Sequence, residues 1–245
     1  MGVKIKTDKN ILIIIPAFNE ELNISNVIFS LKKRIPFADL LVINDGSKDR
    51  TGEIVSSIKD VSLINLPANL GIGGAVQTGF MFAKRYNYNI AVQFDGDGQH
   101  LASEIPKIIL PIEKKSADVV IGSRFRTTDY TGFRSTFLRR IGIRFFEIIN
   151  SMIIRQRISD NTSGFRAYNK NAIHFLADNY PMDYPEPEAV IMLGKNRFRI
   201  KEVYSKMQKR NCGTSSINGF DSVFYMIKVL LAVLMNAVRP RITQD

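Results

Sequence analysis

The sequence predicts an α/β protein in which helices flank an open, mostly parallel β-sheet. Short runs of β-branched and other apolar residues indicate buried strands, and each run ends in a polar loop. A segment with helical spacing follows each loop, so that a strand–loop–helix unit occurs four times within about 110 residues. Ligands of open parallel sheets bind at the carboxyl ends of the strands, so these polar loops predict a binding site.

The four strands follow one another in the N-terminal half of the chain. The first covers residues 11–15 and is closed by Pro16, and a helix follows from about Asn23, with apolar residues spaced for one inner face. The other strands cover residues 40–43, 62–66 and 90–94. Each of them leads into a loop that contains Asn, Asp or Gly, which are residues typical of turns.

The chain of 245 residues divides into one large domain, residues 1–216, and a C-terminal segment, residues 217–245. No internal repeat, low-complexity tract or Pro/Ser-rich linker interrupts the first part. Cys212 is the only cysteine, which excludes an intramolecular disulfide and favours a reducing compartment.

The net charge of +11 is concentrated in two stretches, residues 122–157 and 195–210. The first contains eight arginines against two acidic residues, and its apolar residues suit a basic amphipathic helix. Such helices lie on anionic membrane surfaces. A nucleic-acid partner is not favoured, because both stretches lack aromatic stacking platforms and a helix-turn-helix pattern. A solvated, merely structural face is the remaining alternative.

Residues 217–245 predict a second membrane-surface helix and a tail. Apolar residues recur at helical spacing from Phe220 to Val238, but Lys228 and Asn236 interrupt the stretch. A helix that crosses a bilayer needs about 20 apolar residues, so we expect this one to lie in the interface. Docking on the protein's own core is the alternative.

Two carboxylates at the end of the fourth strand are the most informative feature of the chain. Asp95 and Asp97 alternate with Gly96 and Gly98, which favour a tight turn, and Gln99 follows. Like charges so close repel, so a cation between them would stabilise the turn. A divalent Mg²⁺ or Mn²⁺ ion suits this spacing, and its predicted ligands are Asp95, Asp97 and Gln99. An Asp-Gly turn that only ends a strand is the simpler interpretation.

Six motifs in order resemble those of family 2 glycosyltransferases, whose fold is the nucleotide-sugar-binding GT-A type. They cover residues 14–21, 44–51, 69–75, 95–100, 122–125 and 160–168. The last two are similar to the branch that includes dolichyl-phosphate mannose synthases and bacterial polyprenyl-phosphate sugar transferases. Each motif is weak singly, but their order over residues 10–216 is specific. The loop at 69–74 does not match the glycine fingerprint of dinucleotide-binding proteins, because its glycines come earlier than that fingerprint requires. A Rossmann dehydrogenase is therefore disfavoured.

The resemblance implies a nucleotide sugar donor, a UDP- or GDP-sugar, and a metal-dependent reaction in which Asp97 acts at the leaving diphosphate. Asp45 is expected to accept a hydrogen bond from the base, although Asn44 stands where many relatives have a second aspartate. The donor-binding residues implied in this way are Pro16, Phe18, Glu20, Ile43, Asp45, Asp95, Gly96, Asp97 and Arg210.

The resemblance also implies polyprenyl phosphate as the acceptor. A phosphate monoester is already ionised near neutral pH, so cations must hold it in line and no base is needed. Arg124 and Arg140 are the expected acceptor-phosphate residues, with Arg124 counted as catalytic. Arg210 matches a phosphate-binding position, but the lysine that relatives carry six residues later is Ser216 here.

Two other functions stay open. If the acceptor is a sugar hydroxyl of a lipid-linked glycan, a base is required, and Glu188 is the candidate. Pro185 and Pro187 predict an extended turn there, so a structural role is equally compatible. A catalytically silent, membrane-recruited subunit is the non-enzyme alternative, against which the intact Asp95 and Asp97 pair argues.

The main expectation is an inverting, metal-dependent hexosyl- or N-acetylhexosaminyltransferase of cell-surface glycan synthesis. It would transfer one sugar to undecaprenyl-type phosphate as a peripheral protein on the cytoplasmic face of the cell membrane. The expected partners are the donor, the lipid phosphate and an anionic membrane surface. A small membrane protein is a further candidate partner, and a nucleic acid is not expected.

Overall fold

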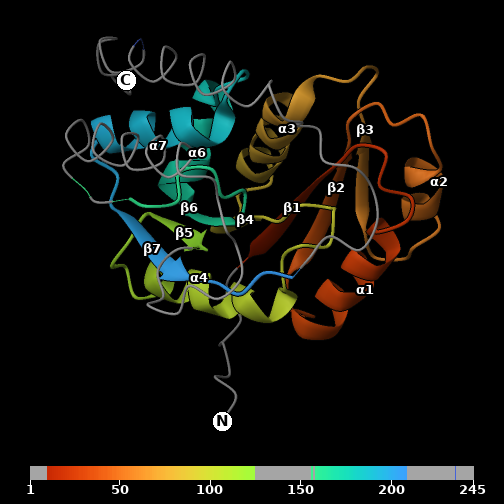
Figure 1. Ribbon diagram of the computed structural model, residues 1–245, viewed down its shortest axis with the longest axis horizontal. Coiled ribbons are helices and arrows are strands. Elements are labelled where there is room, and N and C mark those ends of the chain that lie inside the picture. Colours follow the sequence, from red (N-terminus) through yellow and green to blue (C-terminus); the bar gives the residue numbers. More distant parts are fainter. Residues whose placement is uncertain (1–9, 125–155, 157, 209–234, 236–245) are drawn as a thin grey trace, which may run out of the picture.

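The computed structural model describes residues 10–124, 156, 158–208 and 235. At its centre lies a seven-stranded sheet of order β3-β2-β1-β4-β6-β5-β7 (Figure 1). The strands are β1 Ile11–Ala17, β2 Asp39–Asn44, β3 Ser62–Asn65, β4 Ile90–Gln93, β5 Val119–Ser123, β6 Arg166–Asn169 and β7 Ile200–Tyr204.

The sheet is mostly parallel, as the sequence predicts. β1 pairs in parallel with both β2 and β4, β2 pairs in parallel with β3, and β5 pairs in parallel with β7. Only β6, among the described strands, is antiparallel to its neighbours β4 and β5. Because β6 is antiparallel to both, β5 runs in the direction of β4, and the segment before β6 reaches the edge at which β1, β2, β4 and β5 end.

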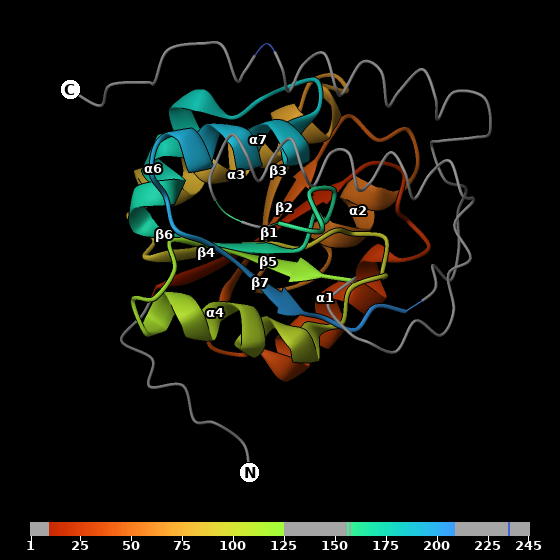
Figure 2. The same ribbon diagram turned by 60° about the vertical axis from the view of Figure 1, so that its left-hand side comes forward.

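Helices cover both faces of the sheet (Figure 2). One apolar core packs under α3 (Gly71–Arg85), α6 (Lys170–Asn179) and α7 (Pro185–Lys195). The opposite core packs under α1 (Ile24–Arg34), α2 (Thr51–Ser56) and α4 (Ile105–Glu113), which follows the short 3₁₀ helix η1 (Ala102–Glu104).

Strand β1 shows why the predicted strands are continuously apolar. Leu12 and Ile14 belong to the first core, whereas Ile11, Ile13 and Ile15 belong to the second. All five side chains are at most 1% exposed. A parallel strand between two helical layers has no solvent face, so alternation of polar and apolar residues is absent.

Two local predictions are wrong. β1 does not end at Pro16 but continues to Ala17, since Pro16 pairs with Ile43 and its carbonyl oxygen accepts a bond from the Gly96 amide at 3.3 Å. Residues 184–188 are not an extended turn, because α7 begins at Pro185. The first-turn amides of a helix have no intrahelical acceptor, so Pro185 and Pro187 give up no helical hydrogen bond there.

Within the described part of the chain, no helix is both long and apolar enough to cross a lipid bilayer. The predicted boundary at 216/217, the C-terminal helix and most of the arginine-rich stretch lie outside the described residues. Arg140 and Arg210 lie outside them as well.

Candidate active site

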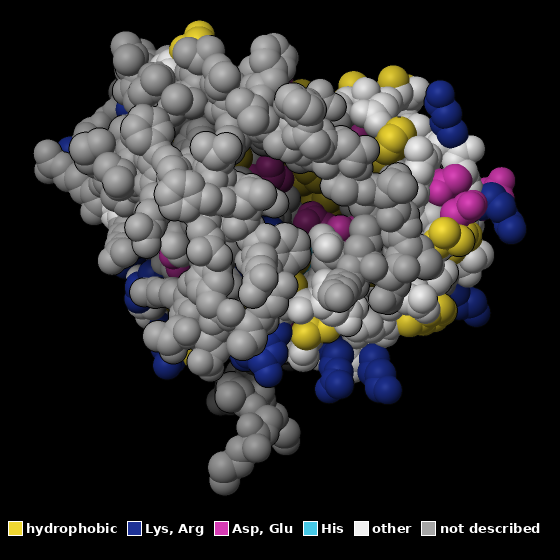
Figure 3. All heavy atoms as spheres, in the orientation of Figure 1, with side chains coloured by type: hydrophobic (Ala, Val, Ile, Leu, Met, Phe, Trp, Pro, Cys, Tyr) yellow, Lys and Arg dark blue, Asp and Glu magenta, His cyan; other side chains and the backbone are white. Residues whose placement is uncertain are grey.

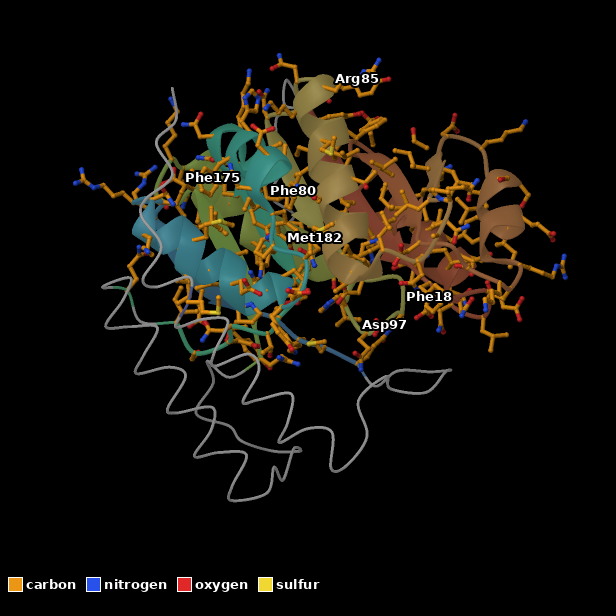
Figure 4. The ribbon with its side chains drawn as sticks, turned by 90° about the horizontal axis from the view of Figure 1, so that it is seen from above. Phe18, Phe80, Arg85, Asp97, Phe175 and Met182 are labelled. Atoms are coloured by element: carbon orange, nitrogen blue, oxygen red, sulfur yellow. The ribbon has the colours of Figure 1, made fainter. Side chains whose placement is uncertain are left out.

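The candidate site is the sheet edge at which β1, β2, β4 and β5 end. Its loops carry the predicted motifs, and Figure 4 shows Phe18, after β1, and Asp97, after β4, at this same edge. In the space-filling view, acidic side chains are visible in a hollow on this side of the molecule (Figure 3). The sequence therefore correctly predicts that the motifs converge, because the parallel pairing brings these loops together.

Asp95 is fixed by a buried histidine. The Nε2 atom of His100 lies 3.0 Å from Asp95 Oδ2, and the His100 side chain is 3% exposed. The imidazole stacks on Phe165 with ring centroids 5.1 Å apart and meets the edge of Phe94 at 5.7 Å. Aromatic packing thus fixes the ring, and the ring orients one carboxylate oxygen.

Gly164 brings backbone close to the same carboxylate. A Cβ at this position would lie 2.7 Å from Asp95 Oδ2, which is closer than real Cβ contacts. The loop before β6 therefore packs directly on Asp95. A side chain at residue 164 would displace the carboxylate, so glycine is required for this close approach.

Asp97 lies in a closed turn. Its Oδ1 atom accepts the Gln99 amide at 2.9 Å, and Gly98 has φ +76°, a conformation that favours glycine. Gln208, which is distant in the sequence, binds the backbone of this turn. Its amide donates to Gln99 O at 2.9 Å, and its side chain donates to Gly98 O at 2.6 Å.

The residues of this turn fit a divalent cation that is completed by substrate. No group of three or more His, Cys, Asp or Glu among the described residues could hold a metal ion. Asp95 and Asp97 supply two carboxylates, and each carboxylate has about four lone-pair positions, so their hydrogen bonds are compatible with ligation. Mg²⁺ is bound in this manner, by one or two carboxylates plus water and phosphates.

The loops after β1 and β2 are bonded to each other. The Asn19 amide donates to Ser47 Oγ at 3.0 Å, and the Lys48 amide donates to Asn19 Oδ1 at 2.9 Å. The amide of Glu20 donates to Thr51 Oγ1 at 2.9 Å. These cross-links make one rigid wall from the two loops.

The predicted donor-binding residues occupy two different environments in this wall. Pro16 and Ile43 are buried neighbours in the sheet. Glu20 is also buried, and its Oε2 atom accepts a hydrogen bond from the Asn23 side chain at 2.7 Å.

Phe18 is 43% exposed, so it presents a ring to solvent or to a ligand. Asp45 is 3% exposed, and its Oδ1 atom accepts the Leu70 amide at 2.7 Å, which ties this loop to the start of α3.

Arg124 follows β5, at the same edge of the sheet as the turn that carries Asp95 and Asp97. Its Nε and Nη2 atoms donate to the two oxygens of Asp160 at 2.9 and 2.8 Å. Burial lowers the pKa of Arg124, the hydrogen bonds and charge of Asp160 raise it, and the charge of Asp95 raises it further, with a net rise. The side chain is still 38% exposed, so the guanidinium can meet a ligand.

Asp160 is itself held by Glu202 from β7. Glu202 Oε1 accepts the amides of Ser159 and Asp160 at 2.9 and 2.7 Å, and Oε2 accepts Ser159 Oγ at 2.9 Å. The orientation of Arg124 therefore depends on a buried chain of polar contacts from the neighbouring strand.

Glu188, the candidate base, is buried in the first turns of α7. Its Oε1 atom accepts the Tyr184 amide at 3.1 Å, so it caps the helix to which it belongs. Exposure of the whole residue is 9%.

Sequence reasoning missed His100, Asp160, Glu202 and Arg166 as parts of the site. His100, Asp160 and Arg166 lie within the motifs at 95–100 and 160–168, so membership of a motif is a signal for them, although it does not give their roles. Glu202 lies 42 residues from Asp160, and no spacing rule connects them.

The comparisons with known proteins agree with this geometry. A protein-family model described as glycosyl transferase family 2 matches residues 12–176. The UDP-N-acetylglucosamine–dolichyl-phosphate N-acetylglucosaminyltransferase of Methanococcus voltae is 32% identical over 247 residues, 91% of this chain and 96% of that protein. Polyprenol monophosphomannose synthase of Mycolicibacterium smegmatis is 25% identical, over 92% of this chain and 87% of that protein.

Solved structures confirm the expected GT-A type of fold. Glucosyl-3-phosphoglycerate synthase from Mycobacterium tuberculosis, in complex with Mn²⁺, UDP and phosphoglyceric acid, has a TM-score of 0.70 at 18% identity, covering 95% of this chain and 80% of that one. The family match and the 32% identity over nearly the whole chain lead to one conclusion. This chain belongs to glycosyl transferase family 2.

Proposed function

We propose that this protein transfers one sugar from a nucleoside diphosphate sugar to a polyprenyl phosphate, with inversion at the anomeric carbon. The observation that carries the proposal is the Arg124 side chain, which is 38% exposed and is held by Asp160 at the carboxyl edge of the sheet. A cation so placed suits an anionic acceptor, which needs to be positioned but not deprotonated. Relatives named for transfer to dolichyl, polyprenol and undecaprenyl phosphates support this acceptor class.

The donor is assigned to the wall formed by the loops after β1 and β2. Phe18 offers an exposed ring for the base, and Asp45 borders the same wall. Asp95, Asp97 and Gln99 would hold Mg²⁺ or Mn²⁺ with the diphosphate. When bound, this ion neutralises the charge that develops on the leaving phosphate. The mycobacterial synthase was solved with Mn²⁺ and UDP, which supports a divalent ion, although that likeness concerns the fold.

Transfer to a sugar hydroxyl with Glu188 as base is the second candidate. Against it stands the capping bond from the Tyr184 amide, which occupies one Glu188 oxygen at 3.1 Å, and the burial of the residue. A general base must reach the proton that it removes. The intact Asp95 and Asp97 turn argues against a silent subunit.

We further propose that the protein acts as a peripheral protein on the cytoplasmic face of the cell membrane, in cell-surface glycan synthesis. The acceptor lipid resides in a membrane, and the net charge of +11 favours an anionic surface. Residues 1–216 would form the catalytic domain and residues 217–245 an interfacial helix. A small membrane protein is a further candidate partner.

The test incubates the protein with membranes, Mg²⁺ or Mn²⁺ and a panel of labelled UDP- and GDP-sugars, and then follows label into lipid extracts. The proposal expects label from one nucleotide sugar in an acid-labile lipid phosphate sugar. Label that appears only in glycan, or in no lipid with any donor, would contradict it.

A further inference from the structure

Residues 205–208, which we call the strap, follow β7 and run along the carboxyl edge of the sheet. At the start of the strap, the Ser205 amide donates to Ser123 O at 3.0 Å, at the end of β5. In its middle, the Lys206 amide donates to Glu104 Oε2 at 3.2 Å. The strap is therefore attached to two separate elements before it reaches the turn that follows β4.

Gln208 binds that turn through both its backbone and its side chain. Its amide donates to Gln99 O at 2.9 Å, and its Nε2 atom donates to Gly98 O at 2.6 Å. The residue before it, Met207, forms an isolated antiparallel bridge with His100. Three consecutive residues of the turn are thus held from one side by two consecutive residues of the strap.

The turn needs bonds of this kind because its backbone has unusual conformational freedom. Gly96 and Gly98 have no Cβ, and Gly98 has φ +76°. A glycine turn that nothing held would place the Asp97 and Gln99 side chains in many relative positions. Ordering them around a cation would then cost entropy and lower the affinity. The Gln208 side chain removes part of this freedom before a cation binds.

We propose that Gln208 is a positioning residue for the divalent cation. Its side chain holds the Gly98 carbonyl and so keeps Asp97 and Gln99 in a geometry that is ready to bind Mg²⁺ or Mn²⁺. This assignment rests on the proposed metal site. The nitrogen that reaches the turn is a hydrogen-bond donor, so it binds the carbonyl oxygen and not the cation. Partners of this kind orient metal ligands from outside the coordination sphere.

The strap also connects the turn to the strand that leads to Arg124. Ser123, which accepts the Ser205 amide, directly precedes Arg124. This connection consists of backbone bonds, which remain when only the Gln208 side chain is changed. Loss of that side chain is therefore expected to affect the affinity for the cation and not the maximal rate of transfer.

Gln208 is suited to mutagenesis because it is exposed. The loop before β6 is held differently, by the Arg166 side chain, which has 0% exposure and donates to Asn161 O and Ser163 O at 2.8 and 2.7 Å. Replacing a buried arginine would leave buried carbonyl groups unpaired and destabilise the fold. A change at Gln208 leaves the core as it is.

The test is a titration of the full-length protein with Mn²⁺, followed by electron paramagnetic resonance, for the wild type and Gln208→Met. Methionine is similar in length but has no donor, so the bond to Gly98 O is lost and the backbone bond to Gln99 O remains. The Mn²⁺ affinity should fall about tenfold. The transfer rate should fall at limiting Mn²⁺ and return to within about twofold of the wild type at saturating Mn²⁺. Gln208→Ala, which also lacks the donor, should give the same result.

Gln77→Met is the matched control. Gln77 in α3 also donates through its side-chain nitrogen to one backbone carbonyl, Ala177 O at 3.2 Å, but this bond joins two helices and no loop of the site. Thermal unfolding should show that the control loses at least as much stability as Gln208→Met. Its Mn²⁺ affinity should equal that of the wild type.

Unchanged Mn²⁺ affinity in Gln208→Met and Gln208→Ala would overturn the proposal. An equal loss of affinity in Gln77→Met would also overturn it, because it would indicate a general effect of stability. A rate that stays low at saturating Mn²⁺ would show that Gln208 acts on something other than the cation. Failure of both Gln208 variants to fold would make the residue structural and count against the proposal.

Asp97→Asn in the same titration separates this proposal from the one on which it rests. If Asp97→Asn weakens Mn²⁺ binding and Gln208→Met does not, only the role of Gln208 fails. If Asp97→Asn leaves Mn²⁺ binding unchanged, the metal site fails and the role of Gln208 fails with it. The titration needs no acceptor, so its result is independent of whether the acceptor is a polyprenyl phosphate.

Discussion

Asp160 holds Arg124 by three hydrogen bonds. The backbone amide and Nε of Arg124 donate to Asp160 Oδ2 at 3.0 and 2.9 Å, and Nη2 donates to Oδ1 at 2.8 Å. Arg199 and Asp118 repeat the same pattern, with 2.8, 3.0 and 2.8 Å, at the opposite end of β5. The two pairs thus share one geometry, but only the first borders the candidate site.

Asp160→Asn should reduce transfer by about 10²-fold, because a guanidinium displaced by about 1 Å no longer holds the acceptor in line. The measurement is the initial rate at saturating nucleotide sugar. Asp118→Asn is the matched control, and it should change thermal stability without a comparable loss of rate. A folded Asp160→Asn protein with the wild-type rate would show that the orientation of Arg124 is not needed.

Asp97→Asn should leave the fold intact and remove most transfer, because the proposed metal site loses a charged ligand. Mn²⁺ binding, followed by electron paramagnetic resonance, should weaken in parallel, and excess EDTA should stop the wild-type reaction. Near-native turnover of Asp97→Asn, or full activity in EDTA, would contradict the metal assignment.

The sequence was sufficient to predict the layers and the position of the site, because both depend on local patterns. The apolar run at 11–15 has to be buried on both faces, and the loops after parallel strands have to meet at one edge. The orientation of Arg124 was not predictable in this way. It depends on Asp160 and Glu202, whose contacts form only when β7 packs beside β5.

The helical start of α7 at Pro185 differs from the extended turn that its two prolines predict. Proline at 185 and 187 reads as an interruption, but the amides that proline lacks are the ones that a first helical turn leaves unbonded. This helical start places Glu188 one turn after Tyr184, where its side chain accepts the Tyr184 amide.

His100→Phe should preserve the ring packing against Phe94 and Phe165 while removing the contact with Asp95 Oδ2 at 3.0 Å. Loss of an outer-shell partner typically costs about 10- to 100-fold in metal affinity, so Mn²⁺ binding should weaken by this factor. Thermal unfolding should show that the variant folds. Unchanged Mn²⁺ affinity would indicate that His100 only fills space.

Glu188→Gln should keep at least a tenth of the wild-type rate, whereas loss of a true general base costs about 10² to 10⁴. Glutamine retains an oxygen that can accept the Tyr184 amide, so the helix cap survives. In the same assay Arg124→Ala should lose nearly all transfer. An inactive, folded Glu188→Gln protein that still binds nucleotide would favour a hydroxyl acceptor.

Sedimentation with vesicles tests the proposed membrane surface. The protein should pellet with vesicles that contain anionic lipid and be partly released by salt, because each basic residue near the surface contributes about 1 kcal/mol that salt screens. Deletion of residues 218–245 should weaken this binding and leave nucleotide binding in place. Equal recovery in the supernatant with and without anionic vesicles would reject peripheral attachment.

The most direct test of the central claim compares two lipids that differ only in the terminal phosphate, undecaprenyl phosphate and undecaprenol. Each is supplied in detergent with purified protein, Mn²⁺ and the labelled nucleotide sugar that the protein binds. We predict transfer to the phosphate and none to the alcohol. Transfer to the alcohol at a comparable rate, or to neither lipid while a lipid-linked glycan accepts the sugar, would contradict the account.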